Sequence, residues 1–303
     1  MTAGQACRAG VRDDIKNMLT DKDFLTKQKP SWCPGCGNFA IWIAMRQALA
    51  ELNLDPHKVL IVYGVGCSGN DTNFIKTYAW HSLHGRAVPT AIGAKLANKD
   101  LTVIVMGGDG DGYGEGLGHL LHAIRGNVNV TYIVHDNKVY GLTTGQTAPT
   151  SDRGFKTKTT PQGTLDNAVN PIALSLVQGI GFVARGFSGQ AEHLKNIFKA
   201  AIQHEGFSLV DVFQPCVTFN KVNTFKWFFD RLYNLDEKKD YSKLNFQQAL
   251  EEAMVWGEKI PYGIFYQADK PEYITSLPQL RGLALAKRSM KVRDISKLLY
   301  EFK

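Results

Sequence analysis

Short, continuous runs of apolar residues recur along the chain and predict the strands of a buried sheet. Residues 59–63 (VLIVY) and 101–106 (LTVIVM) are each followed directly by glycine, and residues 128–134 form a third run. Runs of this length bounded by glycine are typical of parallel strands that are covered on both faces. Residues 181–186 and 208–213 are predicted as the fourth and fifth strands.

Between these runs, apolar positions repeat at helical spacing. Residues 37–52 and 90–96 have this pattern, and further helices are expected to begin near Asn170 and Ser188. After the second strand, one apolar helix face is formed by Leu117, Leu120, Leu121 and Ile124. Strands that alternate with helices predict an α/β fold, in which helices cover both faces of a mostly parallel sheet.

The pattern changes from about residue 225 onward. Charge density rises, strand-like runs become few, and one helix is expected at residues 246–256, followed by an irregular end after Pro261. We therefore predict an α/β domain of residues 1–225. Residues 226–303 are predicted to be a C-terminal extension that packs on this domain or on a partner subunit.

Composition narrows the class of protein. Hydrophobic residues make up 44% of the 303 residues and are present along the whole length, which argues against disorder. No apolar stretch approaches the roughly 20 residues of a membrane helix, and the N-terminus lacks the pattern of an export signal. The net charge of +7 comes from dispersed basic residues. We therefore expect a cytoplasmic protein with no membrane and no nucleic-acid partner.

Two polar segments follow neighbouring strands and indicate a ligand site. Residues 107–110 (GGDG) follow the second predicted strand, and Asn137 follows the third. Ligands of open α/β sheets bind beyond the carboxyl ends of strands, and glycines let the backbone approach a phosphate closely. Asp109 and Asn137 can therefore converge on one cation. Carboxylate, amide, carbonyl and phosphate oxygens form a suitable ligand set for magnesium.

Two other phosphate-binding motifs are absent from the glycine-rich segments of this chain. The dinucleotide fingerprint G-x-G-x-x-G is absent from residues 107–116, and Asn70-Asp71 stands after Gly69 where a P-loop requires Lys-Ser/Thr. Gly108-Asp109-Gly110 is followed after 26 residues by Asn137. This spacing resembles the thiamine-diphosphate motif, in which the aspartate and the asparagine bind the metal that holds the diphosphate.

Four of the five cysteines indicate metal or redox chemistry. Cys33 and Cys36 form a C-x-x-C pair, whereas Cys67 and Cys216 are single, and Cys7 is a spare in a polar tail. One pair plus two distant single cysteines suits an iron–sulfur cubane, but spacing alone also permits a zinc site with spare thiols. A thioredoxin-like pair is disfavoured because no first strand precedes Cys33. The position of Cys67 and Cys216 near strand ends, at the same edge as the GDG turn, favours the cluster.

The motifs together resemble those of one enzyme family. They are W-C-P-G-C-G-N from Trp32, G-V-G-C-S-G-N from Gly64, H-S-L-H-G-R from His81, G-G-D-G-D-G-Y from Gly107, D-N-K-V-Y-G-L-T-T-G-Q from Asp136 and P-C from Pro215. In this order they resemble the β subunit of the archaeal and bacterial 2-oxoacid:ferredoxin oxidoreductases. The resemblance covers nearly the whole chain to about residue 225 and implies a thiamine-diphosphate-binding fold.

The resemblance also implies roles for individual residues. The ligands of a 4Fe–4S cluster would be Cys33, Cys36, Cys67 and Cys216. The magnesium ligands would be Asp109, Asn137 and the carbonyl of Val139. The thiamine diphosphate would lie against Gly66, Cys67, Ser68, Gly108, Asp109, Gly110, Asn137, Gly141 and Leu142, with His84 nearby as a possible catalytic group.

The implied reaction is the coenzyme A-dependent oxidative decarboxylation of a 2-oxoacid such as pyruvate or 2-oxoglutarate. It yields acyl-CoA and CO2, and single electrons pass through the cluster to ferredoxin. Thiamine enzymes also need a glutamate against the aminopyrimidine, and Glu115 is not expected to serve because it follows the turn that should face the diphosphate. An α subunit in a heterodimer, or in a dimer of heterodimers, should supply this glutamate.

Two other classes of protein remain open from the sequence. A non-oxidative thiamine decarboxylase or synthase would bind thiamine diphosphate but no iron. An electron-transfer or zinc-binding module would have no affinity for thiamine. Iron and sulfide content distinguishes the oxidoreductase from the decarboxylase or synthase. Bound thiamine diphosphate distinguishes it from the electron-transfer or zinc-binding module.

Overall fold

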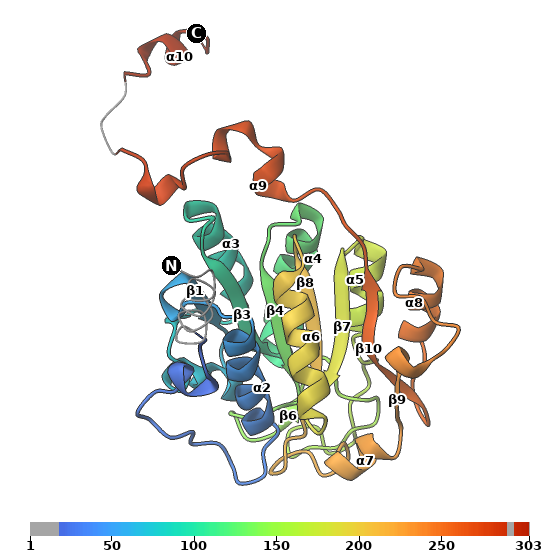
Figure 1. Cartoon of the computed structure of the whole chain (residues 1–303). Coiled ribbons are helices and arrows are strands. Elements are labelled where there is room, and N and C mark those ends of the chain that lie inside the picture. Colours follow the sequence, from blue (N-terminus) through green and yellow to red (C-terminus); the bar gives the residue numbers. More distant parts are fainter. Residues whose placement is uncertain (1–17, 290–293, 303) are drawn as a thin grey trace, which may run out of the picture.

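A computed structural model describes residues 18–289 and 294–302. Its centre is an eight-stranded sheet (Figure 1). In spatial order the strands are β2 (Tyr78–His81), β1 (Val59–Tyr63), β3 (Thr102–Gly108), β4 (Thr131–Asp136), β8 (Ser208–Phe213), β7 (Phe182–Phe187), β10 (Ile260–Gln267) and β9 (Leu232–Asn234). The first six strands are mutually parallel. The predicted fold class, an α/β fold with a mostly parallel sheet, is therefore confirmed.

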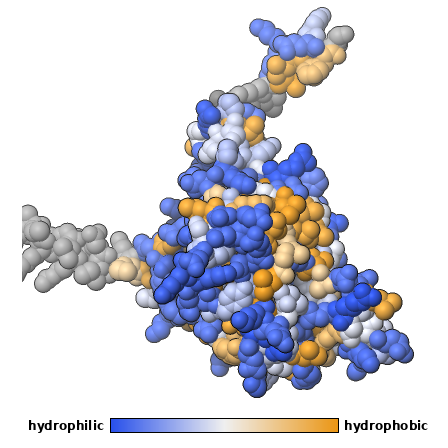
Figure 2. Space-filling view, turned by 90° about the vertical axis from the view of Figure 1, so that its right-hand side faces the viewer, coloured by the Kyte–Doolittle hydropathy of each residue, from blue (hydrophilic) through white to orange (hydrophobic). Residues whose placement is uncertain are grey.

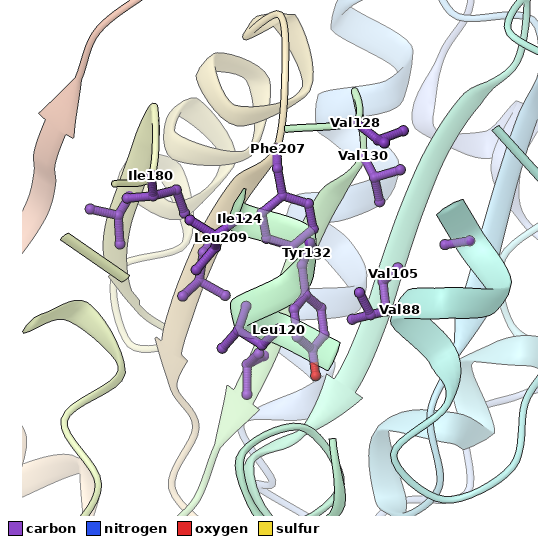
Figure 3. Close-up of a cluster of buried hydrophobic side chains, with 14 of the residues drawn as sticks. Val88, Val105, Leu120, Ile124, Val128, Val130, Tyr132, Ile180, Phe207 and Leu209 are labelled. Carbon is purple, nitrogen blue, oxygen red and sulfur yellow. The ribbon is translucent and has the colours of Figure 1, made fainter. Parts of the chain in front are cut away.

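Helices cover both faces of the sheet, as Figure 1 shows. One face carries α2 (Asn38–Glu51) and α6 (Ala191–Gln203), whose apolar side chains share a buried cluster with β1 and β8. The opposite face carries α3 (Ala87–Ala97), α4 (Leu117–Gly126) and α5 (Pro171–Gln178). Figure 3 shows the core on this second face, where Leu120 and Ile124 of α4 pack with Tyr132, Phe207 and Leu209.

The apolar runs of the sequence form strands because both of their faces are covered. Every residue of β1, β4, β7 and β8 is buried. β1 and β8 have the predicted bounds, whereas β4 begins at Thr131 rather than at residue 128. The difference at β4 arises because Val128 and Val130 pack into the core before the strand ladder begins.

The expectation of an irregular end after Pro261 is wrong, because β10 contains this proline and belongs to the main sheet. β10 pairs antiparallel with β7 only from Gly263 onward, so the missing N–H of Pro261 removes no hydrogen bond from that ladder. β9 then pairs parallel with the start of β10. Residues after 225 therefore extend the sheet of the preceding residues, and the boundary near residue 225 stays a prediction.

The rest of this C-terminal part consists of short helices joined by irregular segments. It contains α7 (Phe225–Phe229), α8 (Phe246–Ala253), α9 (Tyr273–Ser276) and α10 (Ser296–Tyr300). α8 begins at the predicted residue but ends at Ala253, earlier than expected. No helix among the described residues is long and apolar enough to cross a membrane.

Parts of the surface are apolar. At the β2 edge, Tyr78 and Trp80 are more than half exposed, whereas Phe74 is buried in the core. Figure 2 shows further exposed apolar surface on the side of the molecule that carries α5 and α8. Val177 of α5 is 71% exposed, and Met254, in the turn after α8, is 67% exposed. Apolar surface of this kind is typical of a chain that packs against another protein.

Candidate functional site

A recess of about 620 Å³, open to solvent, lies beyond the carboxyl ends of the central strands. It is formed by the segments that follow β1, β2, β3 and β4, where the topology of an open α/β sheet places ligand sites. Every residue predicted to contact the cofactor lines it: Gly66, Cys67, Ser68, His84, Gly108, Asp109, Gly110, Asn137, Gly141 and Leu142. The fold thus brings the predicted set together, while the role of each residue stays a prediction.

The wall formed by residues 66–68 offers space and an unused polar group. Gly66 has a φ of +124°, a conformation that L side chains rarely adopt, and a Cβ added there would meet no atom within 4 Å. The Ser68 hydroxyl is buried and has no hydrogen-bond partner among the described residues. Buried hydroxyls normally have partners. A phosphate oxygen bound in the recess would supply one.

Asp109 is a buried carboxylate at the bottom of the recess. Its Oδ2 accepts hydrogen bonds from the Lys138 backbone N–H at 3.1 Å and from the Thr150 hydroxyl at 2.5 Å. Burial raises the pKa of Asp109 well above its usual value, and the neighbouring Asp136 carboxylate raises it further. A bound divalent cation would offset this cost of ionising Asp109.

The turn after β4 places the other two expected magnesium ligands beside Asp109. The Val139 N–H donates to Asn137 Oδ1 at 3.0 Å, and Lys138 between them has a φ of +61°. Asp109, Asn137 and Val139 therefore line the same recess, and a carboxylate, an amide oxygen and a backbone carbonyl are hard oxygen donors that suit magnesium. No three His, Cys, Asp or Glu side chains of the described residues could hold a metal ion together. The expected magnesium set contains only one such side chain.

The four expected cluster ligands come from three loops that are held together by hydrogen bonds. Trp32 Nε1 donates to the Cys67 carbonyl at 2.8 Å, and the Gly37 N–H donates to the Pro215 carbonyl at 3.4 Å. Among the cysteines, Cys216 is buried and Cys33 is exposed. Cys7 lies outside the described residues.

The thiols are close enough to affect one another. Burial, with smaller effects of the neighbouring Cys216, Cys67 and Cys33, raises the pKa of Cys36 to about 12. Burial, with Cys216 and Cys33, likewise raises the pKa of Cys67 to about 11. Four thiolates at this proximity need positive charge to coexist. No three of the described His, Cys, Asp or Glu side chains could hold one metal ion together, so these cysteines fit a cluster, in which each thiolate would bind a different iron, better than a single ion such as zinc.

Gly141 joins the recess to the cysteines. It lines the recess, and a Cβ added to it would lie 3.7 Å from the Sγ atoms of both Cys67 and Cys216. The sulfur atoms and the recess are therefore separated by little more than one backbone segment.

The structure adds His135, which the sequence did not indicate because a lone histidine in an apolar strand is typical of a core residue. His135 lines the recess, and its Nδ1 is hydrogen-bonded to Asn38 Oδ1 at 2.8 Å. Burial lowers its pKa to about 3, so the ring is neutral. Its Nε2 is buried without a partner among the described residues. The position of His135 directly before Asp136-Asn137 was the available signal.

Comparisons with known proteins agree with this geometry. Residues 64–212 match the family "Thiamine pyrophosphate enzyme, C-terminal TPP binding domain", and residues 216–282 match the family of the C-terminal region of the pyruvate ferredoxin oxidoreductase beta subunit. A 2-oxoacid:ferredoxin oxidoreductase subunit beta from Saccharolobus solfataricus is 49% identical over 78% of this chain and 81% of its own length. A protein of the same name from Sulfolobus sp is 47% identical over 80% of this chain and 83% of its own length.

The chain belongs to the 2-oxoacid:ferredoxin oxidoreductase β-subunit family. It is therefore a subunit of an oxidoreductase that works with an α subunit. A solved 2-oxoglutarate:ferredoxin oxidoreductase from Magnetococcus marinus, with 2-oxoglutarate, coenzyme A and succinyl-CoA bound, has a similar fold. Its TM-score is 0.86 at 37% identity, covering 94% of this chain and 96% of that chain. The resemblance and the enzyme class expected from the sequence are confirmed.

The family matches also account for the C-terminal part of this β subunit. The thiamine pyrophosphate-binding match extends from the end of β1 into β8 and includes Asp109 and Asn137, whereas the second match begins at Cys216 and includes β9 and β10. Trp256, in the second region, packs against the back of the recess, where Lys138 Nζ lies 4.3 Å from its ring centroid. This C-terminal region thus supports the turn that carries Asn137.

Buried ionic contacts fix the same turn from behind. Lys138 Nζ donates to the Thr150 carbonyl at 2.6 Å and to Asp152 at 3.3 Å. Deeper in the sheet, Arg185 Nε donates to Asp211 at 3.5 Å. Breaking a buried pair leaves an uncompensated charge, which is strongly destabilising. These contacts therefore hold the backbone between the recess and the sheet in one conformation.

Proposed function

We propose that this β subunit binds thiamine diphosphate in the recess through a magnesium ion held by Asp109, Asn137 and the carbonyl of Val139. The thiamine pyrophosphate-binding family match supports the cofactor. The oxygen donor set and the buried, hydrogen-bonded carboxylate of Asp109 support the metal. The open space at Gly66 and the Ser68 hydroxyl, which no described residue partners, support the position of the diphosphate.

We further propose that a 4Fe–4S cluster is bound by Cys33, Cys36, Cys67 and Cys216. The observation that carries this proposal is the position of Gly141, which lines the recess and also lies against the sulfur atoms of Cys67 and Cys216. A cluster at these cysteines would be adjacent to the thiamine site, which favours oxidation of the bound substrate over simple decarboxylation.

The proposed reaction is the coenzyme A-dependent oxidative decarboxylation of a 2-oxoacid, such as pyruvate or 2-oxoglutarate, to acyl-CoA and CO2. Bound thiamine diphosphate supplies an electron sink for the carbon that loses CO2. The cluster that Cys33, Cys36, Cys67 and Cys216 would hold would accept the two electrons of each turnover one at a time and pass them to ferredoxin. The activating glutamate is assigned to the α subunit, because Glu115, although it lines the recess, is exposed at the end of the π-helical turn formed by Gly110–Glu115.

The residues of this chain mainly bind and orient. Glycine backbones at the recess admit the diphosphate, and Asp111 ties the surrounding loops by accepting hydrogen bonds from the backbone N–H groups of Val65 and Gly85. Neutral His135 lines the recess, and its buried Nε2 has no hydrogen-bond partner within the described part of the chain. These groups are held in place before the cofactor binds, which lowers the cost of binding it.

The test is anaerobic purification of the α and β chains together, followed by thiamine, magnesium, iron and sulfide analysis. We expect thiamine diphosphate and about four irons per β chain, with a visible absorption that a 2-oxoacid bleaches in the presence of coenzyme A. Thiamine diphosphate without iron would overturn the proposed cluster and the proposed path of electrons to ferredoxin. Zinc without thiamine would overturn both.

A further inference from the structure

Gln214 lies between the expected magnesium ligand Asn137 and the expected cluster ligand Cys36. Its side-chain Oε1 accepts a hydrogen bond from Asn137 Nδ2 at 3.1 Å. Its Nε2 donates to Cys36 Sγ at 3.3 Å and to the Pro215 carbonyl at 3.1 Å. One amide group therefore contacts a ligand from each of the two cofactor sites.

The orientation of both amides follows from their partners. Asn137 Oδ1 accepts from the Val139 N–H, so its Nδ2 must be the atom that faces Gln214. Turning the Gln214 amide over would place its NH2 against the NH2 of Asn137 and its oxygen against the Pro215 carbonyl. Both contacts would be repulsive, so the hydrogen-bond network selects the orientation that donates to Cys36.

The backbone also fixes the position of Gln214. It follows β8 directly, and its N–H donates to the Asp136 carbonyl at 2.8 Å, which continues the pairing of β8 with β4. Its side chain is 1% exposed. A Cβ added to Gly37 would lie 3.0 Å from Gln214 Cγ, so the cysteine loop packs closely on this side chain. Gln214 thus has little freedom to exchange partners.

We propose that Gln214 is a positioning residue that couples the two cofactor sites, by donating a hydrogen bond to the cluster ligand Cys36 while it accepts one from the magnesium ligand Asn137. This inference rests on the proposed function. Hydrogen bonds to the sulfur ligands are among the features that set the reduction potential of an iron–sulfur cluster. Donation to Cys36 stabilises the more negative, reduced cluster, and so raises its potential.

The coupling acts in both directions. Magnesium on Asn137 Oδ1 polarises the amide, strengthens the bond from Nδ2 to Gln214, and in turn strengthens the donation from Gln214 to Cys36. Loading with thiamine diphosphate and magnesium is therefore expected to raise the cluster potential. By thermodynamic linkage, reduction of the cluster is expected to tighten binding of the loaded cofactor.

The test compares Gln214→Glu and Gln214→Met in the purified α–β complex. Gln214→Glu keeps the acceptor for Asn137 but loses both donors and adds negative charge, whereas Gln214→Met removes every hydrogen bond of the side chain. We expect both variants to retain iron and sulfide. Their reduction equilibrium should shift towards the oxidised cluster by roughly twofold to tenfold, the range of one net hydrogen bond, and further in Gln214→Glu. Redox titration followed by electron paramagnetic resonance measures this shift.

Two other variants separate this role from a loosened loop. Asn220→Ala removes the hydrogen bond of 3.1 Å to the Asn137 carbonyl and the bonds that Asn220 Oδ1 accepts from the Val222 and Asn223 N–H groups, so it loosens this loop without touching Cys36. It should weaken thiamine binding while leaving the cluster potential unchanged. Gln203→Met, at the exposed end of α6, should change neither.

The outcomes distinguish this inference from the proposed function. A wild-type complex without an iron–sulfur cluster would sink the proposed function itself. A wild-type cluster whose potential is unchanged in Gln214→Met would overturn the role of Gln214 and leave the proposed function intact. A potential that moves equally in Gln214→Met and Asn220→Ala would also overturn it, because loop packing would then explain the shift.

Discussion

The Asp111 carboxylate accepts a hydrogen bond from the backbone N–H of Gly85 at 2.7 Å. The same oxygen, Oδ1, accepts a second bond from the Val65 N–H at 3.3 Å. Asp111 lies two residues after Asp109, so it joins the loops after β1 and β2 to the turn after β3. The second aspartate of the GDGD motif is thus a structural support of the recess, whereas the first is its expected metal ligand.

From these two hydrogen bonds we predict the effect of Asp111→Ala. Loss of the carboxylate leaves two backbone N–H groups without an acceptor, at a cost of about 1–3 kcal/mol for each buried group. We expect affinity for thiamine diphosphate to fall about tenfold or more, measured by titration of the cofactor-free complex. Asp111→Asn keeps an oxygen at the Oδ1 position and should lose less. Equal, undiminished affinity in both variants would contradict this role.

A second prediction concerns the close contact between Gly110 and Tyr140. A Cβ added to Gly110 would lie 2.3 Å from Tyr140 Cε1, and the Tyr140 hydroxyl donates to the Gly110 carbonyl at 3.2 Å. Gly110→Ala must therefore displace the ring from the wall of the recess. We expect thiamine diphosphate binding to fall at least tenfold while the fold, followed by circular dichroism, is retained.

The matched control for this change is Gly118→Ala. Gly118 lies in α4, and a Cβ added there meets no atom within 4 Å. Alanine in place of this glycine in the first turn of α4 should raise the free energy of unfolding by up to about 1 kcal/mol and leave cofactor binding unchanged. Comparable loss of binding in both variants would show that the contact with Tyr140 is not the cause.

The sequence predicted the parts of the site that depend on strand order. Asp109 and Asn137 directly follow β3 and β4, and parallel neighbouring strands bring their carboxyl ends to one edge. Buried strands can also be recognised as continuous apolar runs, which is why the bounds of β1 were predicted correctly. Position in the chain was sufficient for these features.

Contacts between side chains that are far apart in the chain could not be predicted from the sequence. Gln214 and Cys36 are 178 residues apart, and His135 and Asn38 are 97 apart. No local pattern distinguishes such a glutamine or histidine from an ordinary core residue. The expectation of an irregular end after Pro261 was wrong for a related reason. A proline fits in β10 because pairing with β7 begins only at Gly263, and the sequence does not show where that pairing begins.

A third prediction concerns the cysteines. Replacing any one of Cys33, Cys36, Cys67 and Cys216 by serine should remove most of the iron and sulfide, because a cubane cluster requires all four thiolates. Cys7→Ser, a change outside the described residues, should leave the iron content unchanged. Iron and sulfide analysis of anaerobically purified complexes measures both. Full iron content in Cys216→Ser would show that this cysteine is not a ligand.

The last prediction is that the free energy of unfolding depends on pH through Asp211, a buried carboxyl group behind the recess. Burial, with a smaller effect of Asp136, raises the pKa of Asp211 from 3.8 to about 7, although Arg185 and Tyr113 act in the opposite direction. The unfolded chain therefore loses this proton at lower pH than the folded chain. The contribution of Asp211 to the free energy of unfolding should fall by a few kcal/mol between about pH 4 and pH 7, and change little above it.

Asp211→Asn cannot ionise, so its unfolding free energy should decrease less over this interval than that of the wild type, even if the variant is less stable throughout. Urea unfolding at pH 5 and pH 7.5 measures the difference. Asp230→Asn is the control, because Asp230 has a side chain that is 50% exposed and pairs only with Lys226 among the described residues. It should retain the wild-type dependence. If Asp211→Asn also retained it, the proton would belong to another member of the buried carboxylate group, with Asp136 the first to replace.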